Sequence, residues 1–534
     1  MSYYLLAVAV VIVACVICNK ISSRLGVPML LAFILLGMFF GSDGVVKIPF
    51  SNYALAEQVC SVALIFIMFY GGFGTKWSEA KPVIWQSLLL SSLGTVMTAG
   101  LVGLFCRYVL HIALLESFLI GAVISSTDAA SVFSILRSKR LNLRYNTASM
   151  LEVESGSNDP FSYMLTVIVL SLMNGEVSGS GFAYMLFAQI FFGVVCGVGI
   201  AALALAFMKR FRFASPGFDA IFIVAVAVFS YAIPACIGGN GYLSAYLTGI
   251  ILGNRRIHNK KALVHFFDGM TGLMQMLLFF LLGLLAFPSQ MPSIAPRAFC
   301  IALFLTFVAR PIAVCLILTP FKSSLRQQIL VAWAGMRGAA SIVFAIMTVI
   351  NPAVTHNDIF HIVFFIVLFS ILLQGTLLPI AARWLRMTDA GADVMKTFND
   401  YIDEVPVQFI QFTVTESHPW AGKAICEIVL PPDSLLALLV RKGEQIAPNG
   451  GTVLVPGDTL VLSGKAGDRV CGVQLYERTV RPGDGWAGRK ISEIPPGEAL
   501  VVMIRRGNGV VIPSGDTMLN EGDVLVVNDA KSEK

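Results

Sequence analysis

Long apolar stretches separated by short polar loops run from residue 3 to residue 382. A bilayer core about 30 Å thick needs roughly 20 helical residues for each crossing, and the apolar stretches divide into about thirteen such spans. These spans are 3–18, 28–41, 54–74, 83–110, 113–136, 148–173, 182–208, 217–237, 241–253, 268–287, 297–320, 327–350 and 359–382. The pattern predicts an all-α polytopic membrane domain in which spans two and nine are short.

Basic residues mark alternate loops of this domain. Lys and Arg follow the odd-numbered spans, whereas the loops after the even-numbered spans carry almost no basic residue besides Lys47. Because loops rich in Lys and Arg stay in the cytoplasm, we expect the N-terminus outside and the C-terminal tail inside. The expected location is a bacterial inner (plasma) membrane, where lipid surrounds the spans.

A glycine pattern recurs in two pairs of spans. Spans two and nine both end in Leu-x-Gly-x-x-x-Gly, at 35–41 and 247–253, and apolar runs in spans three and ten end at Gly71 and Gly283. The offset is seven spans in both cases, and an odd offset inverts the second copy. Spans 1–6 and 8–13 are therefore predicted to be inverted repeats, as in many secondary transporters. The alternative is ordinary helix packing through Gly-x-x-x-Gly.

Composition separates the membrane domain from a tail. Hydrophobic residues make up 56% of the 534 residues and charged residues 13%, which is more apolar than a soluble domain. Residues 1–386 carry 24 Lys and Arg against 12 Asp and Glu, and residues 387–534 carry 14 against 20. We therefore expect a basic membrane domain followed by an acidic soluble tail, and no binding of nucleic acid.

An ionisable group inside the membrane is costly and is by default a functional candidate, and seven charged residues of the predicted spans are taken as such candidates. They are Asp128, Glu152, Glu154, Asp159, Asp268, Arg310 and Arg337. In matching places of the two halves, residues 125–128 and 335–338 also interrupt the apolar pattern of spans five and twelve. We expect two broken helices there, because broken helices expose backbone groups that can coordinate an ion.

Span six carries the strongest candidate site. Asp159 lies near the middle of this span, between Asn158 and Pro160, and Ser155 stands one helical turn earlier on the same face. A carboxylate in a partly dry site can exchange a proton for a metal ion near neutral pH. Competition of that kind is what a proton-coupled antiporter requires. The alternative is that Asp159 only neutralises a buried Arg.

These motifs resemble those of the monovalent cation:proton antiporters of the NhaP type, over roughly residues 1–386. The resemblance implies that Asp159 binds both the proton and the transported metal ion, K+ or Na+. It implies that Asn158 marks an electroneutral antiporter and that Thr127 and Asp128 lie where the two broken helices cross. The usual Thr-Asp-Pro reads Thr127-Asp128-Ala129 here, so the break lacks its proline.

The same resemblance implies a structural ion pair. Glu154 and Arg337 match a buried acid–base pair that ties span six to span twelve. Breaking such a pair by removing one partner leaves the other charge uncompensated.

The tail contains a repeat of its own with a period of about 66 residues. The segment that begins at Trp420 recurs from Trp486, residues 441–443 recur as 505–507, and residues 456–458 recur as 521–523. Short β-rich runs between turn residues predict two small α+β modules, at 405–475 and 476–534, after a polar linker at 387–404. Trp420 and Trp486 are expected in the cores of the modules rather than in a ligand site.

The two modules resemble TrkA C-terminal (RCK-C) regulatory domains. The resemblance implies a cytoplasmic tail that binds a small, nucleotide-type ligand and pairs as a homodimer. The tail has no Gly-x-Gly-x-x-Gly motif after a strand, so the nucleotide-binding Rossmann half of that system is not expected.

The sequence as a whole predicts an electroneutral potassium/proton antiporter that works by alternating access and is regulated by its tail. K+ is preferred because RCK-C tails accompany many K+-handling proteins, and a sodium/proton antiporter is the alternative. A ligand-gated cation channel is a different class, and the chain has no Thr-Val-Gly-Tyr-Gly-like filter. With six His and no His-Glu-x-x-His, we expect neither an enzyme nor a cofactor besides the transported K+ (or Na+) and H+.

Overall fold

The chain forms two compact units in the computed structural model, Met1–Ile402 and Asp403–Lys534. The structure describes residues 2–25, 28–139, 141–175, 179–211, 216–255, 257, 260–353, 355–388, 407–416, 418–430, 434–441, 444–446, 448–465, 475–481, 485–493, 500–506, 509–511 and 513–528. Residues 389–404 of the predicted linker lie outside this part of the chain.

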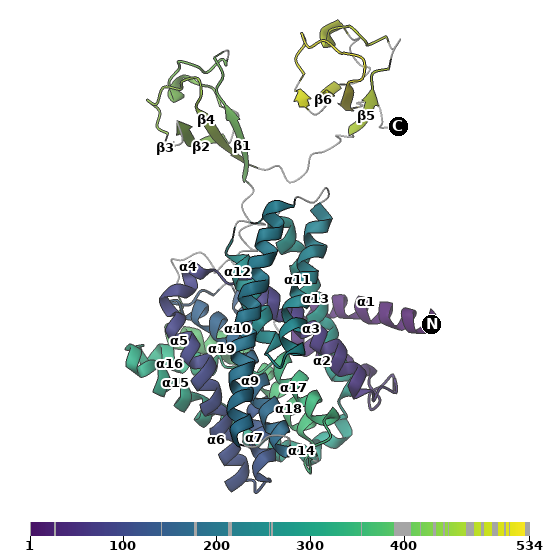
Figure 1. Cartoon of the computed structure of the whole chain (residues 1–534), viewed down its shortest axis with the longest axis vertical. Coiled ribbons are helices and arrows are strands. Elements are labelled where there is room, and N and C mark those ends of the chain that lie inside the picture. Colours follow the sequence, from purple (N-terminus) through teal and green to yellow (C-terminus); the bar gives the residue numbers. More distant parts are fainter. Residues whose placement is uncertain are drawn as a thin grey trace. The chain divides into compact units, whose positions relative to one another are not determined.

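Helices build the first unit (Figure 1). The first half contains α1 (Ser2–Leu25), α2 (Met29–Phe40), α3 (Tyr53–Gly74), α4 (Trp77–Ala80), η1 (Lys81–Val83), α5 (Ile84–Leu89), η2 (Leu90–Gly94), α6 (Thr95–Tyr108), α7 (Leu114–Val123), α8 (Ala129–Ser138), α9 (Thr147–Met173) and α10 (Gly179–Arg210). The second half contains α11 (Pro216–Cys236), α12 (Gly241–Gly253), α13 (Lys260–Leu285), η3 (Pro288–Gln290), α14 (Met291–Phe304), η4 (Leu305–Ala309), α15 (Arg310–Leu318), η5 (Thr319–Phe321), α16 (Leu325–Trp333), α17 (Ala339–Ile350), α18 (Ile359–Phe369), η6 (Ser370–Gly375) and α19 (Thr376–Trp384).

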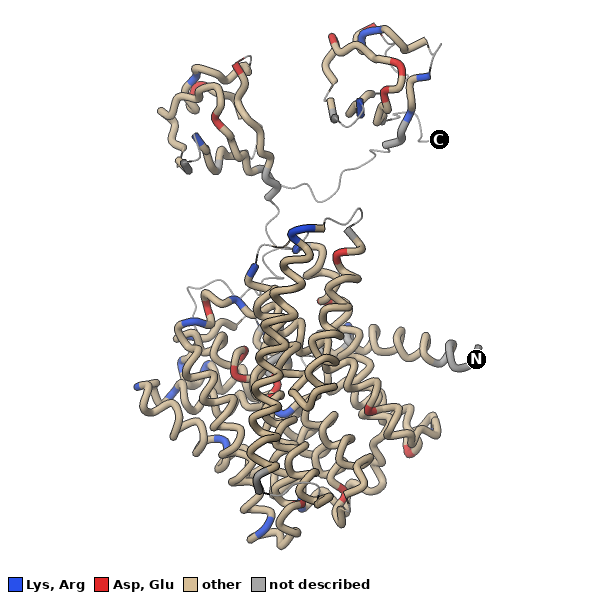
Figure 2. The backbone as a smooth tube through the Cα atoms, in the orientation of Figure 1, with Lys and Arg blue, Asp and Glu red and all other residues tan. Residues whose placement is uncertain are grey.

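The helical unit has the lengths and composition of a membrane domain. Among the described residues, seven helical segments are long and apolar enough to cross a membrane, and shorter apolar helices accompany them. The predicted short spans two and nine are the 12-residue α2 and the 13-residue α12. Figure 2 shows most charged positions at the margins of this unit and few within it.

Two helices are broken where the sequence predicted it. Residues 124–128 separate α7 from α8, and residues 334–338 separate α16 from α17. No proline is needed to restart the first of these helices, because Asp128 accepts a hydrogen bond from the Ser131 backbone N–H at 3.2 Å. A carboxylate in this position satisfies a backbone donor of the first helical turn.

The repeated glycines allow helices of the two halves to touch through their backbones. An added Cβ at Gly37 of α2 would lie 2.8 Å from the Cα of Gly283 in α13, and one at Gly72 of α3 would lie 3.0 Å from the Ile250 nitrogen in α12. The contact on α3 is made by Gly72, whereas Gly71, at the end of the repeated apolar run, has open space around it among the described residues. Each short helix of one half therefore packs on a long helix of the other half.

The described residues of the tail form two four-stranded antiparallel sheets of the same topology. The first sheet has the order β1-β4-β2-β3, with β1 (Val407–Thr413), β2 (Ser434–Arg441), β3 (Glu444–Ile446) and β4 (Thr459–Lys465). The second has the order β5-β8-β6-β7, with β5 (Leu475–Thr479), β6 (Leu500–Arg506), β7 (Gly509–Val511) and β8 (Val524–Asn528). Helical structure in the described tail is limited to the 3-10 turns η7 (Ile425–Glu427) and η8 (Ile491–Glu493).

A buried Asp closes each module in the same way. Asp458 accepts hydrogen bonds from Arg441 Nε at 2.8 Å and Nη2 at 2.7 Å, and Asp523 accepts the same pair from Arg506 at 2.9 and 2.7 Å. The structural counterpart of Arg441 is therefore Arg506, not Arg505, because the second copy is one residue shorter after its Trp. Trp486 lies in the core of the second module, as expected.

Candidate cation and proton site

The two non-helical segments meet inside the helical unit. The Asp128 backbone N–H donates to the Met336 carbonyl oxygen at 2.8 Å, and the hydroxyls of Ser126 and Ser341 lie 3.0 Å apart. An added Cβ at Gly338 would overlap the Asp128 carboxylate. The glycine at 338 therefore lets the two non-helical segments approach closely enough to form the crossing.

Charged side chains complement the helix ends at this crossing. Arg337 Nη1 donates to the carbonyl oxygens of Ser125, at 2.8 Å, and Ser126, at 2.5 Å, just beyond the C-terminal end of α7. Asp128 lies at the N-terminal end of α8 and accepts from the Ser131 hydroxyl at 2.5 Å. A cation near a helix C-terminus and an anion near a helix N-terminus are both favourable, because they oppose the partial charges there.

Asp159 of α9 lies beside this crossing. Its side chain is only 6% exposed, and its Oδ1 atom is buried without a hydrogen-bond partner among the described residues. Asp128 and Arg337 are its charged neighbours. A buried carboxylate oxygen that lacks a protein donor is available for a proton or a metal ion.

Two neighbours of Asp159 fasten α9 to the broken helix. Asn158 Nδ2 donates to the Thr127 hydroxyl at 2.6 Å, and the Ser155 hydroxyl donates to the Thr127 carbonyl oxygen at 2.7 Å. The Oδ1 atom of Asn158 is left buried and without a partner in the described part of the chain. Thr127 is thus held from two points on the helix that carries Asp159.

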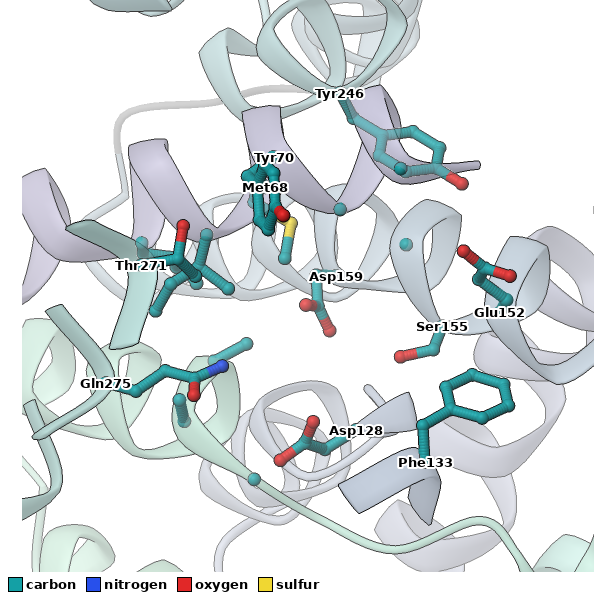
Figure 3. A pocket seen from close by; sticks show the side chains of 18 of the residues that line it. Met68, Tyr70, Asp128, Phe133, Glu152, Ser155, Asp159, Tyr246, Thr271 and Gln275 are labelled. Atoms are coloured by element: carbon teal, nitrogen blue, oxygen red, sulfur yellow. The ribbon is translucent and has the colours of Figure 1, made fainter. Parts of the chain in front are cut away.

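A cavity of about 570 Å³ leads to this carboxylate (Figure 3). Four of the five residues of the predicted cation and proton site line it, namely Thr127, Asp128, Ser155 and Asp159, and so do the charged candidates Glu152 and Asp268. Within the described residues, no cluster of three or more His, Cys, Asp or Glu is placed to hold a resident metal. The oxygen atoms of the four lining residues could instead bind a transported monovalent cation.

The predicted partner of Glu154 is wrong. Glu154 Oε1 accepts a hydrogen bond from Nη2 of Arg310 in α15, and not from Arg337. Glu154 precedes Asp159 by five residues, which places it about 140° around the helix and away from the cavity. Arg310 reaches it past Gly335, where an added Cβ would lie 2.7 Å from Arg310 Nε.

Sequence reasoning also passed over some cavity residues. Arg310 is one of the charges inside the predicted spans, but nothing in the sequence distinguishes it from Arg337 as the partner of Glu154. Thr271 and Gln275 of α13 and Tyr246 of α12 line the cavity. Their signal in the sequence is a polar side chain within an otherwise apolar span.

Comparison with known proteins follows the same division of the chain. The family model described as sodium/hydrogen exchanger, transmembrane, matches residues 8–384. The chain belongs to this family. The TrkA-C domain matches twice, at residues 409–469 and 475–528. The resemblances stated for both parts of the chain are thereby confirmed.

Individual relatives agree with this assignment. The K(+)/H(+) antiporter NhaP of Alkalimonas amylolytica is 31% identical over 468 residues, which cover 87% of this chain and 81% of the relative. The K(+)/H(+) antiporter NhaP2 of Shewanella baltica is 31% identical over 470 residues, with the same coverage. The sodium proton antiporter MjNhaP1 of Methanocaldococcus jannaschii shares the fold, with a TM-score of 0.63 and 24% identity over 72% of this chain and 99% of that one.

Proposed function

We propose that this protein transports K+ and H+ in opposite directions across the membrane and that the two ions compete for the Asp159 carboxylate. The observation that carries the proposal is the Asp159 carboxylate, which is buried, lines the cavity and leaves one oxygen without a partner in the described protein. A site that holds either a proton or a cation, and that opens to one side at a time, couples the two fluxes.

K+ is the proposed cation because the relatives that match most of the chain are named K(+)/H(+) antiporters. Na+ is the second candidate, since the structural neighbour is a sodium proton antiporter. The side chains around Asp159 are oxygen donors, which suit either ion.

Proton flux in proteoliposomes tests this function. The purified chain should move protons when K+ is added on one side, and an Asp159→Asn variant should not, because its amide can neither release a proton nor neutralise a cation. Asp159→Glu should retain part of the exchange with a shifted pH profile. Glu79→Gln, at an exposed position that pairs with Lys76, is the matched control and should behave as wild type.

The cation is decided by adding K+ and Na+ separately in the same assay. Larger proton movement with Na+ at equal concentration would replace K+ by Na+ in the proposal. Appreciable exchange by a purified Asp159→Asn variant would contradict the mechanism for both ions.

We further propose that the tail regulates exchange from the cytoplasm and binds a small, nucleotide-type ligand, in a homodimer of a bacterial inner membrane. The two TrkA-C matches support this role. A chain that ends at Arg386 should still exchange ions but lose its response to cytoplasmic nucleotides. Complete loss of exchange in a well-folded truncated chain would show that the tail takes part in transport itself.

A further inference from the structure

Two helices present the same polar pattern to the cavity. The cavity-lining residues of α9 are Glu152, Ser155, Gly156 and Asp159, and those of α13 are Asp268, Thr271, Gly272 and Gln275. Both sets have the order acid, hydroxyl, glycine, and then acid or amide, with identical spacing. This spacing places each set along one face of its helix.

The two sets also run in the same direction. Three helices, α10, α11 and α12, separate α9 from α13, so a chain that crosses the membrane each time passes through α9 and α13 with the same orientation. The acids Glu152 and Asp268 therefore lie toward the same side, and Asp159 and Gln275 lie deeper. On α9, exposure falls from the half-buried Glu152 to Asp159, at 6%. On α13, Asp268 is exposed, Thr271 is only 8% exposed and Gln275 is half-buried.

One hydroxyl on α13 points to a ligand. Thr271 Oγ1 is buried and has no hydrogen-bond partner within the described part of the structure. Leaving a buried hydroxyl unpaired is unfavourable unless another group satisfies it. Figure 3 shows Thr271 and Gln275 on one side of Asp159, and Ser155 and Glu152 on the other.

We propose that Thr271 and Gln275 determine cation specificity by supplying neutral oxygen ligands across the cavity from Ser155 and Asp159. This inference rests on the proposed function and adds a second wall to the same site. A single carboxylate cannot replace the hydration shell of a monovalent cation, and protein oxygens must take the place of the lost waters. The number and strength of those oxygens then set the preference between K+ and Na+.

Side chains of matched size test the two positions in the full-length protein reconstituted into liposomes. Thr271→Val removes the hydroxyl but keeps the shape, and Gln275→Leu removes the amide. Each should raise the K+ concentration for half-maximal exchange by about three- to tenfold, the range expected for one lost neutral ligand, and should change the K+/Na+ ratio. Thr271→Ser, which keeps the hydroxyl, should stay near wild type.

A control on the same helix separates ligand loss from general damage. Leu277 of α13 is 36% exposed and is absent from the cavity lining, so Leu277→Ala should leave both the K+ dependence and the ion ratio unchanged. A second readout is the rise in melting temperature with added KCl against choline chloride, which reports binding without transport.

The outcomes distinguish this inference from the function on which it rests. Wild-type exchange together with unchanged K+ and Na+ dependence in both variants would overturn the role of α13 and leave the antiporter intact. If the wild type exchanged neither ion, the proposed function would fail. The KCl-dependent melting temperature would then still decide whether Thr271 and Gln275 bind the ion.

Discussion

Arg310 donates a hydrogen bond to Glu154, and the two side chains are only 3% and 1% exposed. The pair connects α9, which carries Asp159, to α15 of the other half of the domain. Two buried charges that satisfy each other restrict how far these helices can separate. The position of the candidate site therefore depends on an ion pair outside the cavity.

Breaking this pair should destabilise the protein. Glu154→Gln and Arg310→Met should each lower the free energy of unfolding by about 3–5 kcal/mol, because each leaves one buried charge without its partner. The double variant should lose less than the sum of the two single losses. Thermal unfolding of the purified variants in detergent measures the three shifts.

An exposed Arg provides the control for this comparison of single and double variants. Arg297 of α14 donates to Asn357 near the surface, so Arg297→Ala combined with Glu154→Gln should give additive shifts. Additive shifts for Glu154→Gln with Arg310→Met as well would show that those two residues do not stabilise each other.

Arg337 should support folding and exchange through the carbonyl groups to which it donates hydrogen bonds. Arg337→Met removes the donor to the Ser125 and Ser126 carbonyls and leaves the C-terminal end of α7 without a compensating charge. We expect lower folded yield and slower exchange, with a smaller effect for Arg337→Lys, which keeps the positive charge. Equal effects of Arg337→Met and Arg337→Lys would mean that the positive charge at position 337 is unimportant. Folded yield and proton flux, normalised to protein, check this order.

Exchange should be electroneutral. Asn158 is neutral, and Asp128 is engaged as the cap of α8 through Ser131, so at the crossing Asp159 is the carboxylate that we expect to trade one proton for one monovalent cation. The initial rate in liposomes should then be independent of a membrane potential clamped with valinomycin. A several-fold change in the rate at saturating cation would indicate that a second group titrates during the cycle.

The backbone contact between α2 and α13 should tolerate no side chain. Gly283→Ala places a methyl group against the Ile34 carbonyl oxygen and Gly37, and overpacking of this kind costs about 1–3 kcal/mol. Gly269→Ala on the same helix is the control, since no described atom lies within 4 Å of its added Cβ. Melting temperatures of the two variants should differ, with the loss confined to Gly283→Ala. Equal melting temperatures would show that the helices shift apart at little cost.

The tail should lose stability in acid. Hydrogen bonds from Arg441 lower the pKa of Asp458, and those from Arg506 lower the pKa of Asp523. A carboxyl group whose pKa is lower in the folded state stabilises the fold above its unfolded pKa, near 3.9, and this contribution disappears as the pH falls through the folded pKa. Thermal unfolding of residues 403–534 should therefore show a falling melting temperature below about pH 4.

Substitution of the two carboxylates tests that account. Asp458→Asn with Asp523→Asn should lower the melting temperature at pH 7 and make it less sensitive to acid. The same steep acid dependence in the double variant would assign the loss to other carboxyl groups.

The sequence was sufficient for features that depend on local pattern. Apolar length predicted the short α2 and α12, and polar residues at mid-depth predicted the breaks after α7 and α16. Asp159 stood out because it lies near the middle of its span, between Asn158 and Pro160, with Ser155 one helical turn earlier. These features are encoded in contiguous residues, so no knowledge of distant contacts is required.

Features that depend on distant contacts were less accessible. From the sequence, Glu154 could be paired with either buried Arg. Only the crossing of the two non-helical segments shows that Arg337 already donates hydrogen bonds to backbone carbonyl oxygens. That Gly72, and not Gly71, packs on α12 likewise follows from which face of α3 meets α12. A shift of one residue rotates a helical position by about 100°, and an apolar run does not specify that rotation.

The exchange of packing partners between the two halves has a consequence for biosynthesis. Gly283, against which Gly37 packs, is synthesised 246 residues later. At about 5–20 residues per second, this interval is roughly 12 to 50 seconds. During that time α2 must remain in the membrane with Gly37 facing lipid or other proteins. The first half of the chain cannot complete its own packing, so its early helices depend on the ribosome finishing the second half.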